Sequence, residues 1–428
     1  MAFSDQGKGK RKIPEIKTIP VPFSLGEIKE TISISTNNPS KPSKEQIINQ
    51  AFRFHSQGNI LEAAKYYQYL IDQGYKDHRV FSNYGVILKD LGKSKEAEFS
   101  YRKAIEINPD FADAHVNLGV ILIDLGKSEE AIIHWEKAVE LKPEVERSVQ
   151  ALGVHLCLKG KYELALKYLS KNKSNSCQSL YLGCLLSLDR EKEFDQKYQE
   201  LSQKKTCNAD IGGIVEHAKI IYGKQYESPF CNEAIKYVLI DKINEESFSE
   251  THLKELISYN KTSSKENRAQ ELLVNGMQTA GNLFSLDYPF IKAIKKALEI
   301  KIEKYKEKFK DSGQGFINNW PRDYELRSWM ISMKNGGFLA PHNHEYGWIT
   351  GSFYLQIPKY SNHDNDSGGI AFSYQGPRYP NKDKNFNLTI KKIATRDICI
   401  FPSSLFHHTI PFDSREERIC FVFDLVQK

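Results

Sequence analysis

Residues 117–143 read NLGVILIDLGKSEEAIIHWEKAVELKP, and residues 83–109 read NYGVILKDLGKSKEAEFSYRKAIEINP. The two stretches share, in the same order and at the same spacing, a glycine, a Leu-Gly-Lys turn, an alanine, an aromatic residue, a second alanine and a proline. A fixed period of this kind indicates a repeat architecture, in which each unit buries its apolar face only by stacking on its neighbours. The period therefore decides the fold of this part of the chain.

The same 34-residue step continues on both sides of these two stretches. The positions that keep it are small residues: Ala51, Gly85, Gly119, Gly153, Gly58, Gly92, Gly126, Gly160, Ala63, Ala97, Ala131 and Ala165. Small residues let two antiparallel helices approach closely, aromatic residues such as Trp135 fill the space between units, and prolines such as Pro143 end second helices. We predict four helical hairpins over residues 44–175, followed by a degenerate fifth in which Phe194 and Tyr198 pack as a closing helix.

These recurring positions resemble the tetratricopeptide repeat, which has Leu-Gly, Ala, aromatic, Ala and Pro at the same offsets. The resemblance implies an α-solenoid over residues 44–205 whose concave surface takes a protein or peptide partner. Asn83 and Asn117 occupy equivalent positions in two successive repeats, at which the family often contacts the backbone of a bound peptide. A helical array that binds no ligand is the alternative interpretation.

Length and composition restrict the remaining possibilities. At 428 residues the chain exceeds one compact core, and about 150 residues per domain gives two or three domains. A hydrophobic fraction of 40% allows most of the chain to fold. The formal net charge of +6 is small for this length and shows no preference for a polyanion, so we predict no nucleic-acid partner.

The sequence contains no signal for a membrane or for secretion. No apolar run reaches the roughly 18 residues of a membrane span, and no apolar segment of the signal-peptide type follows the basic N-terminus. The 7 cysteines are odd in number and form no C-x-x-C pair, which favours reduced thiols without a disulfide framework or a structural zinc. We therefore predict a cytoplasmic location.

Composition also separates the other regions. Residues 1–43 are rich in proline and basic residues, which predicts a disordered basic tail. Residues 206–249 are predicted to form a helical linker, within a stretch that looks mainly helical as far as residue 325. In that stretch, apolar residues keep a helical spacing over residues 290–309.

After Asn318, short apolar or alternating runs are broken by Gly, Pro and Asn, which indicates strands. The candidate strands span residues 327–333, 348–357, 369–374, 397–401, 406–410 and 418–425. Such strands favour a sandwich or a jelly-roll barrel. The predicted fold class of the whole chain is therefore multidomain α + β, an N-terminal α-solenoid followed by a β-rich domain.

Five of the 12 histidines lie between residues 342 and 408. His342 and His344 stand at positions i and i+2, so in an extended segment both imidazoles point to one side and form a ready chelate. His407 follows in the stretch FPSSLFHH, residues 401–408, and Arg418 comes eleven residues after it. These residues form a candidate metal site.

This layout resembles the Fe(II)/2-oxoglutarate-dependent dioxygenases, and most closely their branch that is fused to tetratricopeptide repeats. The matching segments are residues 327–329 (RSW), 336–337 (GG), 341–344 (PHNH), 348–354 (WITGSFY), 401–407 (FPSSLFH) and 418–424 (RICFVFD). The resemblance covers residues 250–428 and implies a double-stranded β-helix (jelly roll) with supporting helices there. It also implies an oxidoreductase, a hydroxylase that couples oxidative decarboxylation of 2-oxoglutarate to hydroxylation of a C–H bond. It implies Fe(II) and 2-oxoglutarate, with ascorbate as a further candidate cofactor.

The resemblance also implies a role for each residue. In such an enzyme three protein ligands occupy one face of Fe(II) and leave positions for the keto acid and O₂. His342, His344 and His407 would be the catalytic metal ligands. Arg418, a fixed bidentate fork, would bind the distal carboxylate of 2-oxoglutarate, with the Tyr354 hydroxyl as a second contact.

One position departs from the family pattern. His344 stands where the family at large has Asp or Glu, which removes an anionic ligand. Glu345 is adjacent but would point to the opposite face of a strand, and Asp364 and Asp366 lie in a loop, so these acids are poorer substitutes.

Two other functions remain open from the sequence. One is a non-enzymatic interaction protein, in which the repeats bind a partner and the barrel is structural or holds a metal without turnover. The other is a cupin-like dioxygenase that uses three histidines and no keto acid. Arg418 favours the 2-oxoglutarate enzyme because neither alternative gives that side chain a role.

Overall fold

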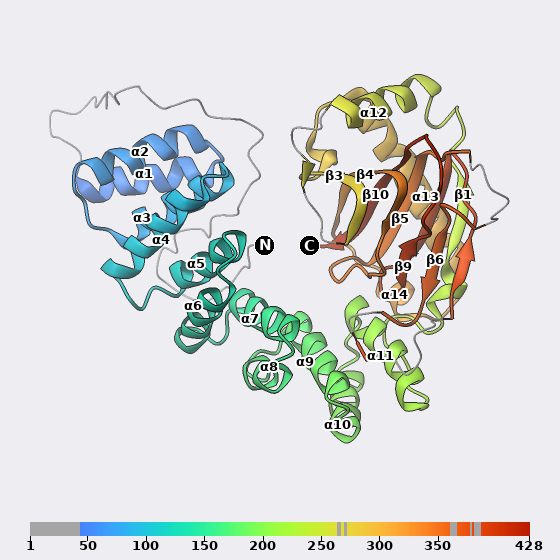
Figure 1. Ribbon diagram of the computed structural model, residues 1–428, viewed down its shortest axis with the longest axis horizontal. Coiled ribbons are helices and arrows are strands. Elements are labelled where there is room, and N and C mark those ends of the chain that lie inside the picture. The colour runs from blue at the N-terminus through green and yellow to red at the C-terminus, as the bar shows by residue number, and fades with distance from the viewer. Residues whose placement is uncertain (1–42, 263–266, 269–271, 360–365, 377–378, 381–386) are drawn as a thin grey trace. The chain divides into compact units, whose positions relative to one another are not determined.

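The computed structural model describes residues 43–262, 267–268, 272–359, 366–376, 379–380 and 387–428 (Figure 1). The chain divides into two compact units, the first ending at Asn172 and the second spanning Lys173–Lys428. The predicted tail lies outside the described residues apart from Ser43, and the other predicted domain limits stay predictions. No helix of the described chain has the length and apolar character that crossing a membrane requires.

The first unit is a stack of four helical hairpins on the predicted period. Its helices are α1 (Lys44–Ser56), α2 (Ile60–Asp72), α3 (His78–Asp90), α4 (Ser94–Ile107), α5 (Ala112–Asp124), α6 (Ser128–Leu141), α7 (Glu146–Leu158) and α8 (Tyr162–Leu169). The first helices of successive hairpins begin at a constant interval, which is the period of the sequence, and so do the second helices. Figure 1 shows the hairpins following one another in chain order, so the predicted α-solenoid is confirmed.

Glycines on the first helices leave room for aromatic rings on the second. A Cβ atom on Gly85 would lie 2.7 Å from the ring of Tyr101, and a Cβ atom on Gly119 would collide with the indole of Trp135. Both aromatic side chains are fully buried. The predicted close approach of paired helices thus has a direct cause, since each ring occupies the space of a missing side chain. Helices α4 and α6 each end two residues before a proline, as the sequence predicted.

Three further helices open the second unit, α9 (Asn175–Ser187), α10 (Glu191–Gln203) and α11 (Ala209–Tyr222). Phe194 on α10 is fully buried, and its ring packs edge-to-face against Tyr222 and Tyr226 with centroids 5.7 Å apart. Helix α11 therefore continues the packing beyond the helix that the sequence predicted as the closing one.

The rest of the second unit is built on two antiparallel sheets. The larger sheet has the strand order β1-β8-β5-β10-β4-β3-β2, and the smaller has the order β7-β6-β9. The six strands predicted from the sequence are all present, as β4 (Tyr324–Leu339), β5 (Ile349–Gln356), β6 (Ile370–Ser373), β8 (Asp397–Pro402), β9 (Phe406–Thr409) and β10 (Arg418–Gln427). Two antiparallel sheets with helices beside them match the predicted jelly roll.

Helices predominate among the described elements between residues 206 and 325, as predicted, but three strands in this stretch were not predicted. They are β1 (Leu239–Lys242), β2 (Asn267–Arg268) and β3 (Leu273–Thr279), and β7 (Thr389–Lys391) was also not predicted. Strands of two to four residues are too short to show a period. In β3 the pairing register shifts between Val274 and Gly276, which breaks the alternation of faces. The other elements are α12 (Glu250–Thr262), α13 (Pro289–Phe309), α14 (Gly315–Asn318) and two 3₁₀ turns, Ala234–Tyr237 and Leu283–Ser285.

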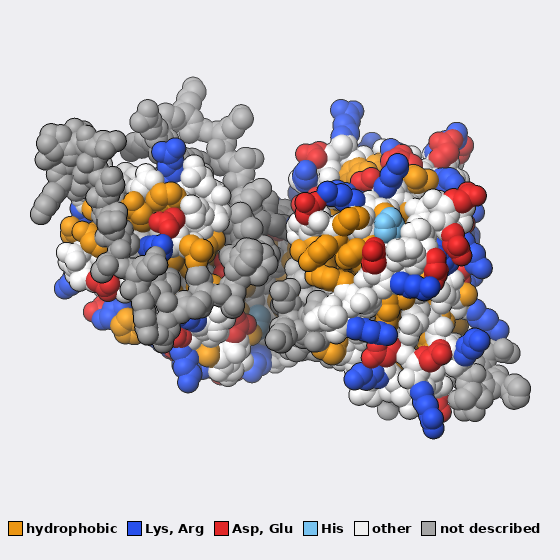
Figure 2. Space-filling view, turned by 90° about the horizontal axis from the view of Figure 1, so that it is seen from above, with side chains coloured by type: hydrophobic (Ala, Val, Ile, Leu, Met, Phe, Trp, Pro, Cys, Tyr) orange, Lys and Arg blue, Asp and Glu red, His pale blue; other side chains and the backbone are white. Residues whose placement is uncertain are grey.

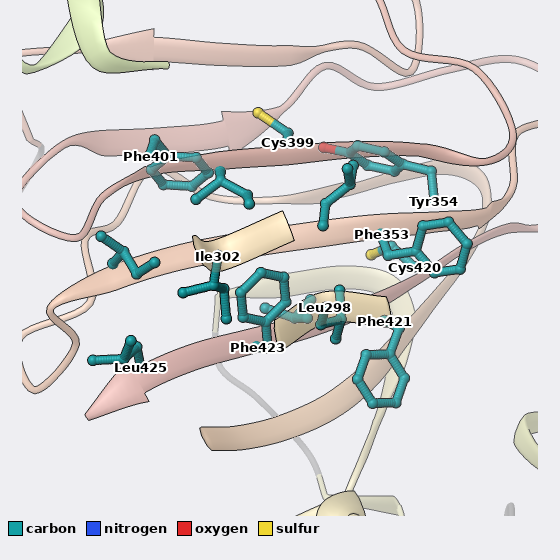
Figure 3. Close-up of a cluster of buried hydrophobic side chains, with 14 of the residues drawn as sticks. Leu298, Ile302, Phe353, Tyr354, Cys399, Phe401, Cys420, Phe421, Phe423 and Leu425 are labelled. Carbon is teal, nitrogen blue, oxygen red and sulfur yellow. The ribbon is translucent and has the colours of Figure 1, made fainter. Parts of the chain in front are cut away.

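Strand β10 has helix α13 packed against one of its faces and the candidate site on the other. Figure 3 shows Phe423 beside Leu298 and Ile302 of α13, the helix that the apolar spacing of residues 290–309 predicted. Gly351 lies opposite Phe423 on β5, and a Cβ atom there would collide with the ring. Because side chains alternate along a strand, the neighbouring residues of β10 face the opposite side of the sheet.

The surface of the second unit shows no segregation of charge on the face in Figure 2. Basic and acidic side chains are interspersed there. Exposed charges of mixed sign interact weakly and at short range. This face therefore offers no extended surface of one sign to a polyanion.

Candidate active site

A cavity of about 180 Å³ lies in the second unit. Its wall is formed by side chains from β3, β4, β5 and β10 of the larger sheet, from β6 and β9 of the smaller sheet, and from the segment that joins β4 to β5. An engineered protein cavity of about 150 Å³ holds benzene. The cavity therefore has room for a small organic molecule.

Three histidines meet at this cavity. The antiparallel backbones of His342 and His407 exchange two hydrogen bonds, with N···O distances of 3.1 and 2.9 Å. One ring nitrogen of each of His342, His344 and His407 lies within 4.8 Å of the other two. The Nε2 atoms of His342 and His344 are 3.3 Å apart, so the pair at i and i+2 does face one side, as predicted.

The Nδ1 atoms of two of these rings fix which nitrogen faces the shared point. Nδ1 of His342 donates to the carbonyl oxygen of Ala340 at 2.8 Å, and Nδ1 of His407 donates to that of Leu405 at 3.3 Å. Burial, with a smaller effect of the neighbouring histidines, lowers the pKa of His342 to about 3 and holds the pKa of His407 well below its ordinary value. Both rings are therefore neutral near pH 7 and carry a lone pair on Nε2, the state that metal binding requires.

His344 has a different partner at Nδ1. That atom donates to Oδ1 of Asp424 at 2.7 Å, and Thr350 Oγ1 donates to the same carboxylate oxygen at 2.8 Å. Ser403 Oγ lies 2.8 Å from Thr350 Oγ1 and extends the network. The ring of Trp329 stacks on the ring of His344, with centroids 5.7 Å apart and planes at 22°. The His344 ring is thus fixed by a hydrogen bond at one edge and an aromatic ring on one face.

Arg418 and Tyr354 lie together on another part of the cavity wall. The guanidinium carbon is 5.2 Å from the centre of the Tyr354 ring. Arg418 is only 2% exposed, and it donates to the carbonyl oxygen of Gly368 at 3.2 Å. No carboxylate forms an ion pair with Arg418 in the part of the chain that the structure describes. A buried guanidinium without a counter-ion is unfavourable, and an anionic ligand would compensate its charge.

Two buried oxygens at the cavity also lack a partner. The Tyr354 hydroxyl and the side-chain oxygen of Gln278 form no hydrogen bond of normal geometry with the described residues. Burial raises the pKa of Tyr354 well above its ordinary value, against smaller opposing effects of Arg418 and Ser352, so the hydroxyl keeps its proton. Since buried polar groups are normally paired, both oxygens are available to form a hydrogen bond with a molecule bound in the cavity.

The structure brings all five predicted site residues to this one cavity. They are His342, His344, His407, Arg418 and Tyr354. Glu345 was expected on the opposite face but also borders the cavity, because a turn at residues 345–346 follows the extended histidine pair. Asp364 lies outside the described residues, and Asp366 does not border the cavity.

Three residues of the site were not singled out from the sequence. Asp424 carries a signal, since it is the one acid in the buried apolar stretch Phe421–Leu425 of strand β10. Thr350 carries none, because its partner is 74 residues away in the chain. Gln278 lies on β3, a strand that the sequence did not predict.

The three imidazoles are suitable ligands for a transition metal, and the nearby guanidinium of Arg418 is a suitable partner for a carboxylate. Imidazole nitrogens bind Fe, Zn, Ni and Cu ions, whereas Mg²⁺ and Ca²⁺ prefer oxygen ligands. A metal held by these three imidazoles would keep coordination positions for further ligands. A carboxylate in the same cavity could form two parallel hydrogen bonds with Arg418.

Comparison with known families agrees with this geometry. Residues 327–424 match the protein-family model described as "Putative 2OG-Fe(II) oxygenase". Residues 78–111 and residues 100–133 match two models that are each described as a tetratricopeptide repeat. The chain therefore joins tetratricopeptide repeats to a domain that matches the 2-oxoglutarate/Fe(II) oxygenases, and both resemblances seen in the sequence are confirmed.

Three solved structures illustrate a low level of similarity to this chain. A tetratricopeptide repeat protein from Parabacteroides merdae is 17% identical, covers 42% of this chain and 73% of its own, and has a TM-score of 0.36. MamA is 23% identical, covering 30% of this chain and 74% of its own, with a TM-score of 0.28. A prolyl-4-hydroxylase from Pseudomonas putida is 10% identical, covering 45% of this chain and 92% of its own, with a TM-score of 0.31. No match was found among curated proteins.

Proposed function

We propose that the second unit is an Fe(II)- and 2-oxoglutarate-dependent dioxygenase that hydroxylates its substrate, and that the repeats recruit the protein or peptide to be modified. The observation that supports this most is the meeting, in one cavity, of three histidines with a buried arginine that forms no ion pair with any described residue. The three histidines account for a metal and the arginine for an anionic cosubstrate.

In this proposal His342, His344 and His407 hold Fe(II) through their Nε2 atoms. Their Nδ1 hydrogen bonds to Ala340, Asp424 and Leu405 keep each ring in the required orientation and tautomer. When bound, Fe(II), 2-oxoglutarate and O₂ supply the chemistry in which the keto acid becomes succinate and CO₂ and the substrate gains a hydroxyl group. The chain itself positions the reactants, binds their charges and excludes water.

Arg418 and Tyr354 bind the distal carboxylate of 2-oxoglutarate. The guanidinium offers two parallel N–H donors, and the tyrosine hydroxyl, which keeps its proton, offers a third. Apolar side chains line the same cavity, among them Ile331, Met333 and Leu339. They limit the access of water, which strengthens the interaction of Arg418 with an anion.

The recruiting surface is proposed on the first helices of the hairpins. Asn83 and Val86 on α3 have counterparts one repeat later in Asn117 and Val120 on α5, and all four side chains are half-buried. Amide side chains can hydrogen-bond a peptide backbone, and the valines offer apolar contact between them. Tetratricopeptide arrays generally bind protein segments on such surfaces.

A succinate-release assay tests the enzymatic part. The full chain is loaded anaerobically with Fe(II), supplied with 2-oxoglutarate and O₂, and followed for succinate. We expect turnover by the wild type, no turnover by His407→Ala, and a large rise in the KM for 2-oxoglutarate in Arg418→Ala. Arg415→Ala is the matched control, because Arg415 is exposed and lies near Arg418 in the chain.

Two results would contradict the proposal. If the wild type binds neither Fe(II) nor 2-oxoglutarate, the enzymatic function is excluded. If Arg418→Ala turns over 2-oxoglutarate with unchanged KM, the cosubstrate assignment is wrong.

A peptide array tests recruitment separately. We expect the wild type to bind a subset of peptides and Asn83→Ala/Asn117→Ala to lose them while keeping its turnover of 2-oxoglutarate. Binding of the same peptides by both proteins would place the recruiting surface elsewhere.

A further inference from the structure

The three-histidine set leaves a question of charge. The usual facial triad of an Fe(II) oxygenase combines two neutral imidazoles with one carboxylate. In this chain the third position is His344, so the three rings that meet at the site bring no negative charge of their own. A divalent cation in a largely buried cavity is poorly solvated, and its binding is weaker without a nearby anion.

Asp424 supplies an anion within one hydrogen bond of the site. Its Oδ1 lies 2.7 Å from Nδ1 of His344, and the side chains of His344 and Asp424 are only 9% and 13% exposed. The hydroxyl of Thr350 donates to the same oxygen at 2.8 Å. Both contacts hold the carboxylate against the back of the His344 ring.

No basic side chain competes for this carboxylate. Among the described residues, Asp424 accepts a hydrogen bond from His344 and forms no ion pair with a lysine or arginine. On the same face of β10, Arg418 lies six residues away, with Cys420 and Val422 between them. The charge of Asp424 is therefore directed at the histidine cluster rather than neutralised by a neighbour.

We propose that Asp424 provides the negative charge of the metal site through His344. Asp424 is a positioning residue in this proposal, since it holds the His344 ring with Nε2 toward the point that the three histidines share. Its hydrogen bond also makes that nitrogen more basic, and therefore a stronger ligand for the metal. The carboxylate that the family has as a direct ligand is thus replaced by a histidine and a carboxylate in series. The inference rests on the proposed function, because it presumes that the three histidines hold a divalent metal.

Metal affinity tests the inference without any need for turnover. Co(II) is titrated anaerobically into the full chain, and binding is followed by calorimetry and by the visible absorption bands of Co(II). Asp424→Asn keeps a hydrogen-bond acceptor for His344 but removes the charge. We expect the Kd for Co(II) to rise about 10- to 100-fold, the usual effect of losing a partner of a metal ligand.

Two further variants distinguish the effect of losing the charge of Asp424 from a general effect on folding. Asp397→Asn removes another buried carboxylate of the same sheet, one that accepts from the backbone N–H of Ala394 and does not border the cavity, and it should leave the Kd unchanged within about twofold. His344→Asp/Asp424→Asn moves the negative charge to the ligand position. It should bind Co(II) more tightly than Asp424→Asn, with absorption bands changed by an oxygen ligand.

The outcomes distinguish the two proposals. If folded wild-type protein binds no Co(II), the proposed metal function fails. If the wild type binds Co(II) and Asp424→Asn binds it equally well, only the role of Asp424 is overturned. The same holds if the Kd of His344→Asp/Asp424→Asn is no lower than that of Asp424→Asn.

Discussion

Burial of the Arg418 guanidinium destabilises the folded protein as long as no anion is bound beside it. Its guanidinium is buried beside the Tyr354 ring, and within the described part of the chain its hydrogen bonds go to a backbone carbonyl and a cysteine sulfur rather than to a carboxylate. A buried charge without a counter-ion destabilises a fold, and a well-packed apolar side chain in its place is often neutral or stabilising. A buried arginine that served stability alone would be expected to form an ion pair with a carboxylate.

This contrast leads to a prediction for Arg418→Met. We expect an unchanged or higher Tm for the metal-free protein, together with at least a tenfold rise in the Kd for 2-oxoglutarate, since a hydrogen bond to a charged group contributes about 1.5–3 kcal/mol. Differential scanning fluorimetry and calorimetric titration in the presence of Co(II) measure the two quantities.

Arg396→Met is the matched control for Arg418→Met. Arg396 donates to the backbone carbonyls of Ile243 and Phe248 and pairs with Glu250, so its loss should lower the Tm and leave the Kd for 2-oxoglutarate unchanged. A fall in Tm for Arg418→Met with unchanged affinity would assign Arg418 a structural role.

The same side chains show what can be predicted from the sequence. His342 and His344 could be predicted to face one point because their relation is local and depends only on an extended backbone. The joining of His407 to them came from resemblance, and the backbone bridge between His342 and His407 explains it. Asp424 could not be assigned, since its contact with His344 depends on how β10 passes behind the loop that joins β4 to β5.

The repeats show a second kind of determinant, the fit between facing helices. Trp135 on α6 fills the space above Gly119 on α5. The first hairpin has Ala51 and Tyr67, both fully buried, at the corresponding positions, so a methyl group is accommodated there beside a smaller ring.

We therefore predict that Gly119→Ala lowers the free energy of unfolding of the first unit by about 1–3 kcal/mol, the usual cost of overpacking a core. Gly119→Ala/Trp135→Tyr should be less destabilised than the sum of its two single variants, because the smaller ring relieves the clash. Denaturant unfolding followed by circular dichroism measures all four proteins. Strict additivity would show that the two residues do not compete for space.

The helices of the repeats could be predicted from the sequence more completely than the strands. The helices of the hairpins repeat the same local contacts once in every period, so the period shows both their number and their limits. Strands β1 and β2 have no such repetition, and they exist because longer strands pair with them, β8 with Leu239–Lys242 and β3 with Asn267–Arg268. Pairing between distant segments cannot be read from a stretch of two to four residues.

Buried histidines make the first unit sensitive to acid. His55 is 3% exposed and shares a hydrogen bond with Tyr67, and burial lowers its pKa to about 4. The unfolded chain takes up this proton near pH 6.5 and the folded chain only near pH 4. Its contribution to stability is therefore complete above pH 6.5 and is lost as the pH falls from 6.5 to 4.

We predict that the first unit loses about 2 kcal/mol of stability through His55 alone when the pH falls from 7.5 to 5. His55→Gln, which can still share a hydrogen bond with Tyr67, should lose correspondingly less over the same range. Denaturant unfolding at the two pH values measures the difference. An equal loss in both proteins would show that His55 is not the group that titrates.

The chain as a whole consists of two compact units, one of repeats and one that holds the metal candidate. Chains of more than one unit commonly unfold in more than one step, and a ligand stabilises only the unit whose folded state binds it. At a free concentration 100 times its Kd, a metal adds about 2.7 kcal/mol to the free energy of unfolding of the unit that binds it.

We predict that scanning calorimetry of the full chain shows two transitions and that Co(II) raises the transition temperature of one of them. His342→Ala should abolish that shift and leave the other transition where it was. If Co(II) moves both transitions by the same amount, the units do not unfold independently, and the site then stabilises the repeats as well.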